Sequence, residues 1–364
     1  MNRTKVVRLA LITALLIMTL SGAASAISPG EAAAQALAWL KPQQNGDGGF
    51  GSGFGPGSAV GLTADAVIAI TSAGQDASSW TRGGASPIDY LRAQVKAGKV
   101  KLPGEIAKTV LALVASGHDP RAFGGRSLIA DLKARLDASS GRYSSSMYDQ
   151  SLAILALSNA GEPAPEAAVT ALLKTQTVEG GWAFTGDTLA GAADSNTTAL
   201  AVQALVAVGR KDDTGRALDY FRRVQNADAG WAYQVPSPFG TDTDANSTAL
   251  ATQAILATGD SISNWATRGR DPIGALLALQ NANGSFSFQN AFPGPNVLAT
   301  LQAIPALYGR TLAQVSVVRA SGSSAPTPVL LPIAGGSIDT LSIAALGLIL
   351  VAAGYLARRH VRIS

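Results

Sequence analysis

Two stretches separated by a loop decide the fold: QTVEGGW (Gln176–Trp182) and DSNTTALAVQALVAVG (Asp194–Gly209). The first places a Gln six residues before a Trp, and the second is an apolar helical pattern that ends at a Gly. The same unit returns as QNADAGW and DANSTALATQAILATG (Gln225–Gly259), and a weaker copy covers Gln280–Gly309. Repetition at a nearly constant period predicts a repeat architecture.

Two spacings locate all the units. A Gln stands six residues before an aromatic residue in four pairs: Gln44 and Phe50, Gln176 and Trp182, Gln225 and Trp231, Gln280 and Phe286. Glycines that end apolar helical patterns recur every 43 to 50 residues, at Gly74, Gly117, Gly161, Gly209, Gly259 and Gly309. Gly is favoured there because it adopts the left-handed cap conformation. We therefore expect an all-α fold of six helix pairs over residues 27–318, as an open solenoid or a closed ring.

The Gln-x-x-x-Gly-x-Trp pattern resembles the QW repeat of squalene cyclases, and also the repeats of protein prenyltransferase β subunits and of cobalamin carriers. The resemblance covers residues 31 to about 312. It implies an α6/α6 toroid, in which the helix before each Gln is outer and the helix that ends at each Gly is inner. It also implies that each Gln caps backbone groups beneath the aromatic ring, so the repeat residues are expected to be structural.

Both ends of the chain have the features of targeting segments. Residues 1–26 combine a basic start, an apolar run and an Ala24-Ser25-Ala26 cleavage site, as a signal peptide does. Residues 319–330 read as a Pro/Ser linker. We therefore expect the toroid to be exported.

Residues 331–364 resemble a cell-wall sorting signal that sortases cut. Leu331, Pro332, Ala334 and Gly335 follow the Leu-Pro-any-Thr-Gly motif, except that Ala334 stands where Thr is usual. The alternative is a retained anchor, since the largely apolar run from Thr340 to Ala357 has 18 residues and makes roughly 27 Å of helix, enough to span a bilayer. Both alternatives place the toroid at a bacterial cell surface, attached to the membrane or the cell wall.

Charge and composition exclude some partners. The chain carries +4, of which residues 1–26 hold +3 and residues 335–364 hold +2, so residues 27–334 carry −1. The basic pI therefore belongs to the ends and gives no reason to expect nucleic-acid binding. The chain has no Cys and only two His, His118 and His360, so we predict no zinc site of the prenyltransferase kind and no cofactor.

A squalene-type cyclase would protonate an alkene with the middle Asp of an Asp-x-Asp-Asp-Thr-Ala motif at the start of an inner helix. Here DSNTTA and DANSTA place Asn196 and Asn246 at the position of that acid. A shifted register would instead use Asp242 and Asp244, and it leaves the motif incomplete. A diverged isoprenoid cyclase is therefore the alternative rather than the main prediction.

Three further possibilities have less support. A carbohydrate-processing enzyme would need paired carboxylates across the cavity. A calcium loop beginning at Asp242 departs from the required pattern at Ser247 and Gln253, so no metal is predicted. In cobalamin carriers, by resemblance, the ligand lies between the toroid and a following β domain. After Gly309 this chain has too few residues before its linker for such a domain, so cobalamin binding by this chain alone is not expected.

We expect binding of a small molecule or a surface partner rather than catalysis. Polar residues at the starts of inner helices and aromatic residues in the enlarged loops 183–193 and 232–243 mark one rim as the binding face. The candidates are Asp194, Asn196, Asp244, Asn246, Asn296, Tyr233 and Phe239. The alternative for the Asp and Asn residues is helix capping.

Overall fold

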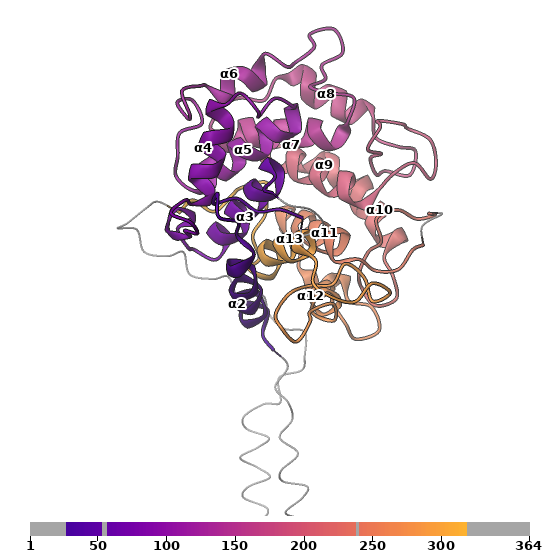
Figure 1. The fold of residues 1–364 in the computed structure, drawn as a ribbon. Coiled ribbons are helices and arrows are strands. Elements are labelled where there is room, and N and C mark those ends of the chain that lie inside the picture. Colours follow the sequence, from indigo (N-terminus) through magenta and orange to yellow (C-terminus); the bar gives the residue numbers. More distant parts are fainter. Residues whose placement is uncertain (1–26, 53–56, 238–239, 319–364) are drawn as a thin grey trace, which may run out of the picture. The chain divides into compact units, whose positions relative to one another are not determined.

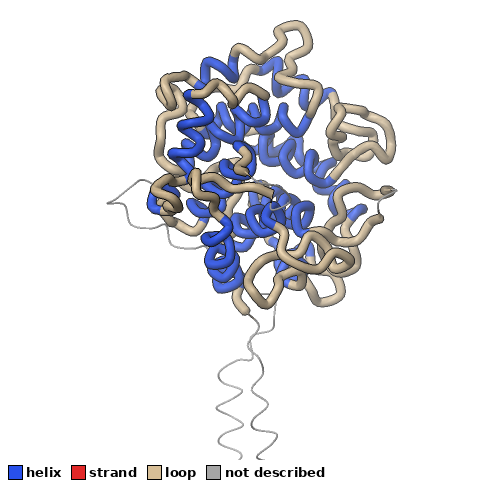
Figure 2. Tube along the Cα trace, in the orientation of Figure 1, coloured by secondary structure: helices blue, strands red, loops and turns tan. Residues whose placement is uncertain are grey.

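A computed structural model describes residues 27–52, 57–237 and 240–318, all of which belong to the unit Met1–Leu331. The predicted signal peptide, the linker and the sorting signal with its anchor lie outside the described residues, as does Phe239. Figure 2 shows helices and loops but no strand in the described part. Within these same ranges, none of the helices has the length and apolar character needed to cross a membrane.

The described residues form six pairs of α-helices (Figure 1). The inner helices are α3 (Val60–Ser72), α5 (Pro103–Ala115), α7 (Met147–Asn159), α9 (Ser195–Ala207), α11 (Ala245–Ala257) and α13 (Val297–Leu307). The outer helices are α2 (Pro29–Leu40), α4 (Pro87–Lys96), α6 (Leu128–Lys133), α8 (Glu166–Lys174), α10 (Gly215–Val224) and α12 (Pro272–Leu277). Short 3₁₀ turns lie at Lys41–Gln43, Ala77–Ser79, Lys211–Thr214 and Ile262–Trp265.

The inner helices close into a ring. Each packs against the next along the chain, and α13 packs against α3 and α2. The Gln280 side chain of the last unit donates to the Ala32 carbonyl of the first, with 2.8 Å between the atoms. The closed alternative is therefore the observed one, and the all-α prediction is confirmed for the described residues.

The inner helices are apolar on most sides, as expected for helices surrounded by protein. Helix α11, for example, buries every residue from Ala245 to Ile255. The outer helices bury one face only: α10 buries Tyr220 and Phe221. All six predicted stop glycines have positive φ, from 63° to 77°, which confirms the left-handed helix ends.

Each Gln-aromatic turn is pinned to its inner helix by a repeated set of hydrogen bonds. The Gln Nε2 donates to the carbonyl four residues later, as in Gln176 to Gly180 (2.7 Å). The aromatic residue donates its N–H to a Thr hydroxyl on the inner helix, as in Trp182 to Thr198 (2.8 Å). The same Thr contact joins four turns: Phe50 to Thr63, Trp182 to Thr198, Trp231 to Thr248, and Phe286 to Thr300.

A second repeated bond joins neighbouring units at the rim. The first residue of an inner helix donates its N–H to the carbonyl two residues beyond the next unit's aromatic residue. These pairs are Met147 with Phe184, Ser195 with Tyr233, and Ala245 with Phe288. Each enlarged loop is therefore hydrogen-bonded to the start of the inner helix of the preceding unit.

The chain after α13 crosses the opposite end of the ring, where the inner helices end. The Leu312 N–H donates to the Gln203 side chain (2.7 Å), the Val315 N–H to the Asn159 side chain (2.9 Å) and the Val318 N–H to the Ala115 carbonyl (2.8 Å). This closing segment, residues 310–318, covers the ends of α5, α7 and α9. The rim is the opposite end of the ring, where the inner helices start.

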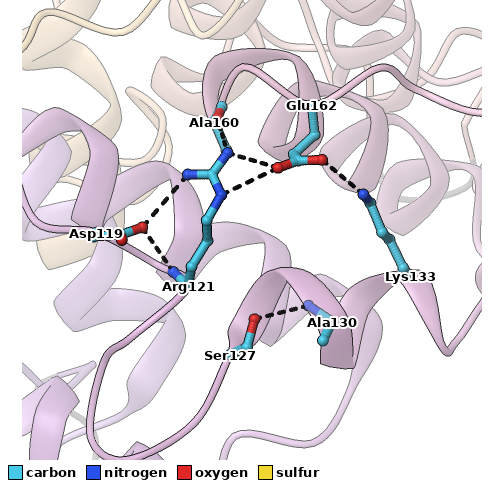
Figure 3. A network of polar contacts seen from close by, with 7 residues as sticks. All are labelled: Asp119, Arg121, Ser127, Ala130, Lys133, Ala160 and Glu162. Atoms are coloured by element: carbon cyan, nitrogen blue, oxygen red, sulfur yellow. Dashed lines mark hydrogen bonds and ion pairs between the residues drawn. The ribbon is translucent and has the colours of Figure 1, made fainter.

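Outside the ring, an ion-pair network joins α6 to the loop after α7 (Figure 3). Glu162 pairs with Arg121 (2.6 Å) and with Lys133 (2.6 Å), and Arg121 also donates to the Ala160 carbonyl. These ion pairs hold α6 and the loop before it to the end of α7 at the surface, where salt screens such pairs.

Candidate ligand-binding site

A pocket of about 380 Å³ lies on the rim between the two enlarged loops. Asp194, Phe184, Tyr233 and Gln234 are among the residues that line it. Phe184 and Tyr233 leave 49% and 44% of their surfaces exposed. The structure thus brings together two of the sequence-predicted residues, Asp194 and Tyr233, at a site that presents aromatic faces.

Hydrogen bonds fix the shape of this pocket. Gln234 Nε2 donates to the Gly191 carbonyl (2.7 Å), and the Gly191 N–H donates to Glu179 (2.8 Å). The Tyr233 carbonyl accepts the Ser195 N–H at the start of α9 (2.7 Å). Both loops are therefore held to the ring, and the pocket is largely formed before any ligand arrives, which lowers the ordering cost of binding.

Asp194 is a buried carboxylate among the residues that line the pocket. Its Oδ1 caps α9 by accepting the Thr197 N–H (2.7 Å), and its Oδ2 accepts the Phe184 N–H (3.0 Å). Burial raises the pKa of Asp194 to about 6, although these hydrogen bonds oppose the shift. Burial, with the neighbouring Asp194, also raises the pKa of Tyr233 to about 12. The phenol is therefore protonated at neutral pH and is a potential hydrogen-bond donor.

The other predicted candidates do not gather at this pocket. Asp244 caps α11, with its two oxygens accepting from the N–H and the hydroxyl of Ser247. Asn296 caps α13 by accepting the Ala299 N–H (2.9 Å). Asn196 and Asn246 instead lie within the first turns of α9 and α11. The three Asn residues are thus not equivalent, because α13 begins two residues later relative to its stop glycine.

The two carboxylates that a squalene-type cyclase could use, Asp242 and Asp244, do not form an acid site in the described residues. Asp242 is exposed, and both oxygens of Asp244 are used in capping. The cavity at the centre of the ring has a volume of about 30 Å³, room for about two water molecules. Pockets that hold drug-sized ligands are on the order of 300–1,000 Å³. A polyprenyl chain therefore has no room in this central cavity.

Several polar side chains that were not predicted from the sequence stand among the mostly apolar residues that line the central cavity. Lys108 pairs with Asp65 at 2.8 Å, and Tyr148, Gln253 and Gln302 lie beside them. The sequence does contain a signal for these residues, because each is a polar residue within an otherwise apolar inner helix. In a closed ring such a residue must face either a neighbouring helix or the centre.

Comparison with known proteins places this fold. A family model described as "Eukaryotic cobalamin-binding protein" matches residues 88–330. The chain belongs to this cobalamin-binding family. Among curated proteins, no sequence match is found.

Solved structures agree on the fold at low sequence identity. The type II terpene cyclase MstE from Scytonema has a TM-score of 0.56 at 14% identity, covering 77% of this chain and 96% of that one. Haptocorrin in complex with Cbi has 0.50 at 16%, covering 80% and 71%. An unsaturated glucuronyl hydrolase specific for heparin has 0.52 at 13%, covering 77% and 96%. These structures differ in function and share the α/α ring, so they support the fold alone.

Proposed function

We propose that this protein binds a cobalamin-type corrinoid on the rim of its toroid and is exported to hold that ligand at the cell surface. The observation that carries the proposal is the family match over residues 88–330. The solved haptocorrin complex with Cbi, which has the same ring fold, supports it. Catalysis has no comparable support, because the cyclase carboxylates are exposed or used in capping.

The geometry fits a ligand that rests on the rim. A corrin macrocycle is too large for a central cavity of about 30 Å³. It can lie over the rim pocket, where Phe184 and Tyr233 offer apolar faces and Gln234 and the Tyr233 hydroxyl offer hydrogen bonds. A corrinoid was not expected from the sequence alone, and the family match is what favours it here.

The test is equilibrium dialysis of the purified chain against cyanocobalamin and dicyanocobinamide, both of which absorb visible light. Retention of either supports the proposal. Replacing Tyr233 by Ala removes a pocket aromatic and should weaken binding about tenfold, which corresponds to about 1.4 kcal/mol. Phe292→Ala is the matched control, because Phe292 is 66% exposed and does not line the pocket.

Failure to retain any corrinoid, with a folded protein, would overturn the proposed ligand. A geranylgeranyl-bearing substrate incubated in parallel should give no cyclic product. The cell-surface part is tested separately by fractionating cells and asking whether the chain without residues 331–364 is released into the medium.

A further inference from the structure

One carboxyl group on the rim is bonded to both aromatic walls of the rim pocket. Asp194 Oδ2 accepts the N–H of Phe184 in the first enlarged loop (3.0 Å). The hydroxyl of Tyr233, in the second enlarged loop, donates to the same carboxyl group. Asp194 Oδ1 accepts the Thr197 N–H at the start of α9 (2.7 Å). Both walls are therefore tied to α9 through one residue.

Tyr233 is held at two points. Asp244 caps α11 and also accepts the backbone N–H of Tyr233, whereas Asp194 accepts its hydroxyl. Asp194 lines the pocket and Asp244 does not. Of the two contacts, the one to Asp194 can change without moving the backbone, because a hydroxyl group rotates and a peptide N–H does not.

The surroundings of Asp194 are neutral and dry. Asp194 is 2% exposed, and it has no ion-pair partner in the part of the chain that the structure describes. The titratable side chains that face it are Tyr148 of α7, Tyr220 of α10 and Tyr233. Burial raises the pKa of each of these tyrosines, so all three are neutral at pH 7. Asp187, which is exposed, also lines the pocket and adds a negative charge.

A proton added to Asp194 reverses one of its hydrogen bonds. The carboxylate offers only acceptors, and Thr197, Phe184 and Tyr233 all donate to it. The carboxylic acid has an O–H of its own that needs an acceptor, and a backbone N–H cannot serve as one. The Tyr233 oxygen can, but the phenol must then turn its own hydrogen away from Asp194.

We infer that Asp194 is a positioning residue of the rim pocket, whose carboxylate form fixes the Tyr233 side chain for the ligand and whose acid form releases it. The pocket therefore holds its ligand at neutral pH and lets it go in acid. Burial raises the pKa of Asp194 to about 6, which sets the release in mildly acidic surroundings. This inference rests on the proposed function for the ligand and adds the condition for its release.

The experiment measures the affinity of the full chain for cyanocobalamin by equilibrium dialysis at about pH 7.5 and about pH 5. The charge of cyanocobalamin does not change between these two values. About nine-tenths of the Asp194 side chains are protonated at the lower pH, so wild type should bind about tenfold more weakly there.

Asp194→Asn keeps the cap through its Oδ1 and places N–H donors where the acid has its O–H. The variant should bind about tenfold more weakly than wild type at the higher pH and should show no difference between the two pH values. Asp149→Asn is the matched control. Burial also raises the pKa of Asp149, at the start of α7, but this residue does not line the pocket. The control should keep the difference between the two pH values.

Each outcome decides the inference. Equal affinity of wild type at both pH values overturns it, while the proposed function stands. An Asp194→Asn variant that binds like wild type, or that binds more weakly but keeps the pH dependence, also overturns it, since the latter marks a structural role alone. If wild type retains no corrinoid, the proposed function fails, and NMR of the ligand-free chain decides. The Phe184 amide and Tyr233 ring signals should then titrate at about pH 6 in wild type and stay constant in Asp194→Asn. Signals that do not titrate in wild type would overturn the inference.

Discussion

Replacing Asp244 by Asn should change how the protein's stability depends on pH. Burial raises the pKa of Asp244 to about 6, against about 3.9 for an Asp in an unfolded chain. Because the folded pKa is the higher one, the contribution of Asp244 to stability is fully present below the unfolded pKa and is lost as pH rises through about 6. A pKa difference of two units corresponds to about 2.7 kcal/mol in the free energy of unfolding.

Asn at position 244 can keep the cap, since its Oδ1 can accept the Ser247 N–H and its Nδ2 can donate to the Ser247 hydroxyl. Urea unfolding at about pH 4 and about pH 7 gives the free energies. Relative to wild type, the variant should gain about 2–3 kcal/mol on going from the lower to the higher pH. Asp242→Asn, at an exposed residue, is the control and should follow wild type. Parallel pH profiles for wild type and Asp244→Asn would refute the reasoning.

Three further substitutions test how the ring is held together. Lys108→Met leaves the Asp65 charge unpaired and should cost about 3–5 kcal/mol in urea unfolding, whereas Lys108→Met with Asp65→Leu should recover most of that loss. Thr198→Val leaves the Trp182 N–H without its acceptor and should cost about 1–3 kcal/mol, whereas Thr198→Ser should be nearly neutral in the same assay. Gln280→Leu removes the bond from the last unit to the first, so hydrogen exchange should speed up in α2 and α12 together, and exchange confined to α12 would contradict the closure role.

The repeat was predictable from sequence because its signals are local. A Gly with positive φ and a Gln six residues before an aromatic residue are fixed by bonds within one unit, so four clear copies were enough to place the helices. The rim pocket was partly predictable for the same reason. Tyr233 stands in an enlarged loop and Asp194 precedes an inner helix. Each of these features is visible in the local sequence, so neither requires knowledge of the fold.

The centre of the ring could not be predicted in the same way. Asp65 and Lys108 are 43 residues apart and meet across two helices at 2.8 Å. Sequence shows each as a polar residue in an apolar helix, but not which helix lies opposite. Asn196, Asn246 and Asn296 are 50 residues apart in the sequence, but this equal spacing does not give them equal roles. The later start of α13 makes Asn296 a cap, while Asn246 bonds to Gln302.

The contact between α2 and the last unit has a consequence for how the chain acquires its structure. In an open array of repeats, each unit added extends a stack that is already stable. Here α2 has its partner in the ring only when residues about 250 positions later have been synthesised. Removing a helix pair from either end should therefore abolish cooperative unfolding, rather than leave a shorter array that still folds. A chain that crosses a membrane N-terminus first could not close its ring until the last helix pair had crossed.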